Sequence, residues 1–103
     1  MKFENVYDKY LLYLSTNLKP TTILFIDRGF KKHILPYFKD KDVFKINNDD
    51  IIIWQNYIKN LGFSDSFNYN IQIMFKKFFN YLEDFYYIKN IFKKYNFIKT
   101  FCL

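Results

Sequence analysis

Apolar side chains recur every three or four residues along much of the chain, which is the spacing of one face of an α-helix. The first such segment predicts a helix over about residues 3–16, followed by a connection at residues 17–19. Its predicted inner face consists of Phe3, Tyr7, Tyr10, Leu11 and Leu14.

A second helix is expected to begin after Pro20, with Thr21 or Thr22 as its cap, because a threonine oxygen accepts a bond from an orphan backbone N–H. Pro36 should end this helix near Leu35, since proline disfavours helix at the preceding residue. The predicted buried stripe is Ile23, Ile26, Phe30 and Ile34. Residues 37–46 are expected to form a loop anchored by apolar side chains.

Asn47 or Asn48 predicts the start of a third helix, and Gly62 its end, because glycine tolerates the left-handed conformation that follows many helices. The predicted inner face of this helix is Trp54, Tyr57, Ile58 and Leu61. Ser64 or Ser66 should then cap a fourth and longest helix, which extends to about residue 87. The predicted stripe of the fourth helix is Phe67, Ile71, Met74, Phe78, Leu82 and Phe85.

These elements predict an all-α fold: a compact bundle of four main helices, with a short helix or linker from Asn90. We expect one helical domain over residues 1–90, and residues 91–103 as a short helix or the start of a linker. The 103 residues suffice for a core without metal or disulfide, and 24% aromatic residues exclude a disordered chain.

The net charge is +6, a basic balance that suits an anionic partner. Two zones carry it: residues 19–45 and residues 89–103 are each net +4, and the rest of the chain is net −2. Cys102 is the only cysteine, and neither a signal peptide nor a membrane-spanning run is present, so a cytoplasmic location without membrane contact is expected.

The residue types that catalysis or metal binding needs do not come together. His33, the only histidine, lies near the end of the second helix and is interpreted as structural. Asp40 with Asp42 is too small a set for a metal ion, and Asp49 with Asp50 fits helix capping. The sequence therefore predicts no enzyme, no metal site and no small-molecule cofactor.

Several short motifs follow one another along about residues 3–92. They are Leu18-Lys19-Pro20-Thr21-Thr22, His33-Ile34-Leu35-Pro36-Tyr37-Phe38, Ile46, Asp49-Asp50-Ile51, Trp54-Gln55, Gly62-Phe63-Ser64, Asn70 and Phe78-Phe79-Asn80-Tyr81. In order and spacing this set resembles the N-terminal core-binding (SAM-like) domain of tyrosine recombinases, the integrases of phages and other mobile elements. That family cuts DNA with a C-terminal domain carrying an arginine, a lysine, a His-x-x-Arg pair and a tyrosine. Arg28 is the only arginine of this chain, so the resemblance implies that the catalytic domain is missing.

The resemblance also implies that the partners are double-stranded DNA and, in the full-length protein, further recombinase protomers. The N-terminal ends of the second and fourth helices would approach the major groove. The implied base-edge candidates are Thr21, Thr22, Ser64, Ser66 and Asn70, with Asn68 weaker. The implied phosphate candidates are Lys19, Arg28, Lys31, Lys32, Lys76 and Lys77.

Two other interpretations stay open. The chain is also compatible with a helical protein-interaction module that docks through the apolar segment 91–103, or with a small regulatory DNA-binding protein complete at this length. The small regulatory DNA-binding protein is disfavoured, because about twelve residues separate the second and third helices. This connection is too long for a helix-turn-helix.

Overall fold

The computed structural model describes residues 1–89, and these are all-α, as predicted. The chain forms two compact units, residues 1–46 and a second unit that begins at Asn47. The first unit contains α1 (Phe3–Leu14), α2 (Pro20–His33), α3 (Leu35–Phe38) and the short 3₁₀ turn η1 (Val43–Lys45), and the second contains α4 (Asn48–Asn60) and α5 (Asp65–Tyr86). The domain assignment 1–90 stays a prediction, and the helix or linker expected from Asn90 lies outside the described residues.

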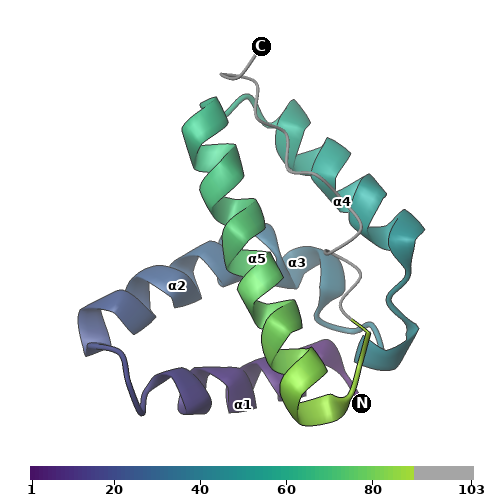
Figure 1. Ribbon diagram of the computed structural model, residues 1–103. Helices are drawn as coiled ribbons and strands as arrows, with labels where there is room; N and C mark the ends of the chain where they lie inside the picture. Colours follow the sequence, from purple (N-terminus) through teal and green to yellow (C-terminus); the bar gives the residue numbers. More distant parts are fainter. Residues whose placement is uncertain (90–103) are drawn as a thin grey trace. The chain divides into compact units, whose positions relative to one another are not determined.

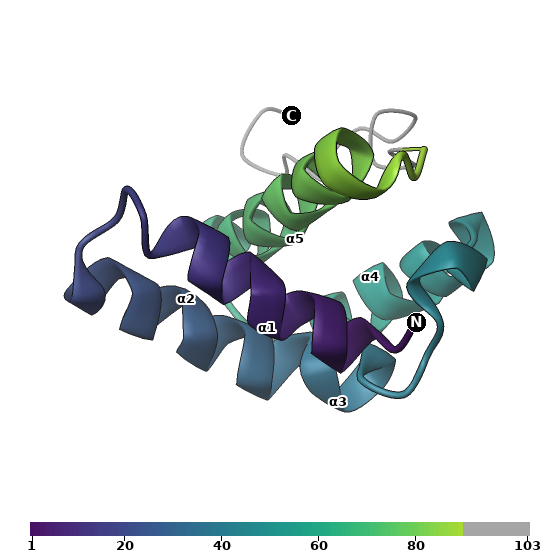
Figure 2. The same ribbon diagram turned by 90° about the horizontal axis from the view of Figure 1, so that it is seen from below.

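In the first unit, α1 and α2 lie side by side and run in opposite directions, joined by the connection at residues 15–19 (Figures 1 and 2). Their facing side chains are largely aromatic. The ring of Tyr7 stacks on Phe30 at 4.7 Å between centroids, and Tyr10 lies at 6.1 Å from the same ring. All three side chains are buried, so this cluster holds the helical hairpin together.

The beginning of α2 differs from the prediction that Thr21 or Thr22 caps it. The helix starts two or three residues earlier than these caps imply, at Pro20, and Lys19 occupies the N-cap position without a side-chain hydrogen bond. Proline suits the first helical position because its φ is already helical and no N–H is lost there. Both threonines therefore lie inside the first turn, and neither has the capping role that was expected.

Pro36 ends α2 as predicted but also begins another helix. α2 stops at His33, and α3 follows after Ile34 with Pro36 in its first turn. The predicted loop at residues 37–46 is therefore partly wrong, since proline is as favourable at a helix start as it is unfavourable inside one. α3 buries Phe38 against Phe3, with ring centroids 5.7 Å apart.

The two ends of the first unit are joined by main-chain hydrogen bonds. The N–H of Phe3 donates to the carbonyl of Lys41 at 2.8 Å, and the N–H of Val43 donates to the carbonyl of Met1 at 3.0 Å. Between them, Lys2 and Asp42 form an antiparallel bridge. These bonds place the start of α1 beside the segment that follows α3.

In the second unit, both helix starts follow their predicted caps. The side-chain oxygen of Asn47 accepts a hydrogen bond from the N–H of Asp50 at 3.0 Å. The carboxylate of Asp50 in turn accepts one from the N–H of Asn47 at 3.1 Å. This reciprocal pair is a capping box. Ser64 accepts from the N–H of Phe67 at 3.2 Å, which starts α5, and Gly62 has φ +80° just after α4, as its predicted role requires.

Packing within the second unit centres on Trp54 of α4. Its indole meets the ring of Phe75 of α5 edge-on, at 4.9 Å between centroids, and both are fully buried. Gln55 donates to Gln72 at 3.1 Å beside them, which satisfies a polar side chain that is itself buried.

The predicted inner faces of α4 and α5 are confirmed in part. Trp54, Ile58, Ile71, Phe78 and Leu82 are buried, whereas Tyr57, Leu61, Phe67 and Phe85 are exposed. Leu61, Phe67 and Phe85 lie in or next to the first or last turn of their helices, whereas Tyr57 is adjacent to the buried Ile58. Phe75 and Phe79, which lie off the predicted stripe, are buried instead.

Candidate nucleic-acid interface

Positive charge is concentrated in the first unit. Residues 1–46 carry nine Lys or Arg side chains against five Asp or Glu, a net charge of +4. Residues 47–89 carry four cations against five acids, a net charge of −1. Among residues 1–89, the first unit therefore provides the larger share of the charge that would attract an anionic partner.

The exposed face of α2 carries the most ordered set of candidate residues. Thr21, Phe25, Arg28 and Lys32 follow at intervals of four, three and four, so they form one stripe along the helix, which we call the α2 stripe. All four are exposed, whereas Phe30 on the opposite face is buried. Lys19 precedes the stripe at the N-cap position and is also exposed.

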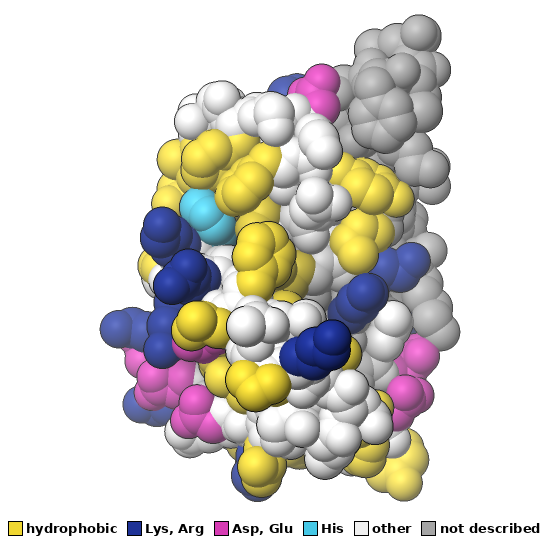
Figure 3. Space-filling model, turned by 90° about the vertical axis from the view of Figure 1, so that its left-hand side faces the viewer, with side chains coloured by type: hydrophobic (Ala, Val, Ile, Leu, Met, Phe, Trp, Pro, Cys, Tyr) yellow, Lys and Arg dark blue, Asp and Glu magenta, His cyan; other side chains and the backbone are white. Residues whose placement is uncertain are grey.

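Figure 3 shows dark-blue cationic side chains gathered beside the cyan histidine, with yellow hydrophobic side chains exposed next to them. The only histidine is His33, at the end of α2. Within residues 1–89, no carboxylate forms an ion pair with Arg28 or Lys32. Both charges are thus available to a partner.

Lys31 differs from Lys32, its neighbour in sequence. Its ammonium lies 3.0 Å from the carboxylate of Asp27, one turn earlier on α2. The other oxygen of Asp27 accepts a bond from the hydroxyl of Tyr7 on α1 at 2.6 Å. Burial and then this hydrogen bond to a carboxylate raise the pKa of Tyr7 well above its ordinary value, so the phenol remains a donor at all ordinary pH values. Lys31 therefore pairs with Asp27 at the surface of the unit, with its own side chain 66% exposed, and lies to one side of the α2 stripe.

His33 is uncharged near neutral pH. Desolvation by burial lowers its pKa below the usual 6.5, and the neighbouring positive charge of Lys32 lowers that pKa further. The histidine therefore adds no positive charge to the stripe at neutral pH.

Phe25 is the member of the α2 stripe that sequence reasoning missed. Its side chain is 68% exposed, and Leu24 beside it is 51% exposed. A helical projection of the sequence could have shown that Phe25 is exposed. Phe25 lies five residues before the buried Phe30, and this spacing puts the two rings on nearly opposite faces of the helix. The predicted buried stripe of this helix did not include Phe25, and no surface role was predicted for it either.

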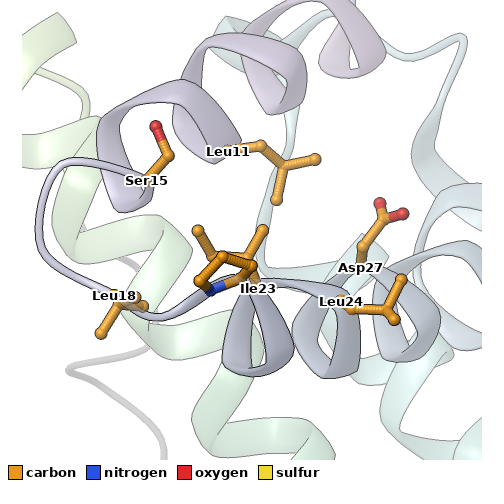
Figure 4. Close-up of a pocket in the computed structure, with 7 residues that line it drawn as sticks. Leu11, Ser15, Leu18, Ile23, Leu24 and Asp27 are labelled. Atoms are coloured by element: carbon orange, nitrogen blue, oxygen red, sulfur yellow. The ribbon is translucent and has the colours of Figure 1, made fainter.

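An apolar pocket of about 390 Å³ opens between the last turns of α1 and the first turns of α2 (Figure 4). Its lining is aliphatic apart from a serine and a carboxylate: Leu11, Ser15, Leu18, Pro20, Ile23, Leu24 and Asp27. The carboxylate of Asp27 is already engaged by Tyr7 and Lys31. The pocket thus lacks the convergent polar groups that fix a small ligand.

The remaining candidates lie on α5. Ser66, Asn70 and Lys77 are exposed and follow at intervals of four and seven, so they share one face. Lys76 is half-buried and points about a quarter-turn away, and the hydroxyl of Ser64 is already the helix cap. The predicted DNA-binding residues thus divide between the two units, with six in the first and these five in the second. The DNA-contact role of each of these residues stays a prediction.

Within residues 1–89, no group of three or more His, Cys, Asp or Glu side chains is placed to hold a metal ion. No helix of this part of the chain has the length and apolar character needed to cross a membrane.

A family model described as "Phage integrase, N-terminal SAM-like domain" matches residues 2–59, more than half of the chain. The match runs from the start of α1 to the last turn of α4, and it confirms the predicted family over that range. Neither a curated protein nor a solved structure matches the chain.

Proposed function

Because the chain belongs to the family of phage integrase N-terminal SAM-like domains, we propose that it is a DNA-binding domain of a tyrosine recombinase. In this proposal it grips double-stranded DNA at a recombination site, and a catalytic domain elsewhere in the parent protein cuts and rejoins the strands. Further protomers of the parent assemble on the same DNA, in the cytoplasm of a cell that carries the mobile element.

The α2 stripe is the observation that carries this proposal. Arg28 and Lys32 are exposed along one side of a 14-residue helix, and Lys19 is exposed at the N-cap position before it. A helix with its side chains is about 10–12 Å across, which matches the width of the major groove, about 12 Å. Cations on the outer face of such a helix reach phosphates, and the exposed Thr21 and Thr22 in its first turn lie where small polar side chains contact base edges.

The α5 face of Ser66, Asn70 and Lys77 provides a second contact in this proposal. Its support is weaker, because Asp65 places a carboxylate in the first turn of α5 and the described part of this unit has a net charge of −1. We therefore assign the larger share of the electrostatic attraction to the first unit.

The test is fluorescence anisotropy of a labelled duplex of about 24 base pairs, titrated with the full chain at several salt concentrations. Binding should weaken log-linearly with salt, and replacing Lys19, Arg28 and Lys32 together with Ala should reduce the slope by about 2.7, or 0.9 for each lost phosphate contact. The matched control replaces Lys9, Lys39 and Lys45, which are exposed in the same unit but outside the stripe, and should change the slope much less.

Equal slope changes in the two triple variants would mean that net charge, and not the α2 stripe, governs binding. Absence of binding at low salt would reject DNA contact by this chain and would favour a protein-interaction module.

A further inference from the structure

The α2 stripe has an apolar centre that electrostatic attraction does not explain. Phe25 lies between Thr21, four residues before it, and Arg28, three residues after it, and its side chain is 68% exposed. Burial of a phenylalanine side chain is favourable, and here most of that gain is not realised in the chain itself, because the ring is mostly exposed. A partner that covers this face would realise it.

The neighbours of Phe25 restrict the kind of partner. A purely apolar protein surface would desolvate Arg28 and Lys32 without pairing them, which is unfavourable. An anionic partner that also offers apolar groups between its charges avoids that cost. In the major groove, the 5-methyl group of thymine is the apolar group that base edges present, and phenylalanine is among the side chains that contact it.

From this geometry we infer that Phe25 is a specificity-determining residue that packs on the 5-methyl groups of thymines in the major groove, while Arg28 and Lys32 hold the flanking phosphates. The inference rests on the proposed DNA-binding function and adds a direct preference for one base. A phenylalanine ring has no hydrogen-bond donor or acceptor, so methyl contact is the way in which it distinguishes base pairs.

The experiment compares two duplexes of equal length and charge, alternating dA–dT and alternating dA–dU, which differ in the 5-methyl group. The full chain should bind the thymine duplex about fourfold more tightly for each methyl group buried, as expected from the burial of one methyl-sized apolar group. Phe25→Ala should abolish this preference while keeping the salt dependence, because the cations are unchanged.

Phe44→Ala is the matched control, since Phe44 is a 58% exposed phenylalanine of the same unit that lies in η1, outside the stripe. It should keep the preference for thymine. Replacing cytosine with 5-methylcytosine in an alternating dG–dC duplex adds a methyl group at the equivalent groove position, and should strengthen binding of the unaltered chain but not of Phe25→Ala.

Equal affinity of the unaltered chain for the thymine and uracil duplexes would overturn the inference while leaving the proposed function intact. A thymine preference that survives in Phe25→Ala would also overturn it, as would a loss of affinity in Phe25→Ala that is equal for both duplexes. If Phe25 instead supports binding to phosphatidylserine vesicles and neither duplex is bound, both the inference and the proposed function fail.

Discussion

Lys31 and Lys32 are neighbours with the same charge, but their surroundings predict different contributions to DNA binding. Lys32 belongs to the α2 stripe and is exposed, whereas the ammonium of Lys31 lies 3.0 Å from the carboxylate of Asp27. A lysine that keeps its carboxylate partner does not neutralise a phosphate, so it releases no counterion from the DNA. Lys32→Ala should therefore weaken binding much more than Lys31→Ala.

The magnitude follows from counterion release. One lost phosphate contact lowers the slope of log affinity against log salt by about 0.9, which is about eightfold in affinity at about 0.1 M salt. Between about 0.05 and 0.2 M salt, the affinity ratio between the unaltered chain and Lys32→Ala should shrink by about 3.5-fold. For Lys31→Ala, the ratio of its affinity to that of the unaltered chain should stay nearly constant over the same salt range.

Anisotropy titrations of both variants on one duplex, at four salt concentrations, measure these slopes directly. Far-UV circular dichroism checks that both variants keep their helices. Identical slope changes for the two variants would refute the reasoning, because they would show that the pairing of Lys31 with Asp27 does not distinguish it from Lys32.

Three further predictions concern the folded state. Trp54→Ala should lower the free energy of unfolding by about 3–5 kcal/mol in urea titrations, because it empties a fully buried site against Phe75; a cost below about 1 kcal/mol would contradict the packing described. Gly62→Ala should cost about 1–2 kcal/mol from its φ of +80° alone, since no atom lies within 4 Å of the added methyl group, and an unchanged urea midpoint would mean that the turn is not left-handed. The pKa of His33 is lowered in the folded state, so the unfolded chain binds the proton more readily and stability should fall as the pH decreases through 6.5. His33→Asn should remove that pH dependence between about pH 7.5 and 5.5, and an unchanged dependence would assign it to another group.

Local signals in the sequence predicted most helix boundaries. Asn47, Gly62 and Ser64 act through hydrogen bonds or backbone angles within three residues of themselves, so their roles are readable without the fold. The start of α2 was missed because Pro20 and the following threonines both suit a helix start, and only one of them can be first. The family was likewise predictable, because it depends on ordered motifs rather than on side-chain positions.

The surface of α2 was predictable in part. The exposure of Arg28 and Lys32 follows from their charge and spacing, but the engagement of Lys31 requires knowing that Tyr7 of α1 and Lys31 converge on Asp27. Tyr7 and Asp27 are twenty residues apart in the chain, so the periodicity of the sequence does not predict their contact. Phe25 lay outside the predicted buried stripe, but periodicity alone does not show how far its side chain is exposed, because that depends on what packs beside α2.

The joined ends of the first unit have a mechanical consequence. Met1 pairs with Val43 and Phe3 with Lys41, so the two segments run antiparallel and their outer ends lie on the same side. A pulling force applied through residues 1 and 46 would load these hydrogen bonds one after another, as in opening a zipper, and not all at once in shear. Each hydrogen bond contributes only about 0.5–1.5 kcal/mol net. Tension would therefore break these bonds between residues 1–3 and 41–43, which close the unit, before it disrupted the aromatic cluster of α1 and α2. The closure is thus the point at which the unit would yield first under load.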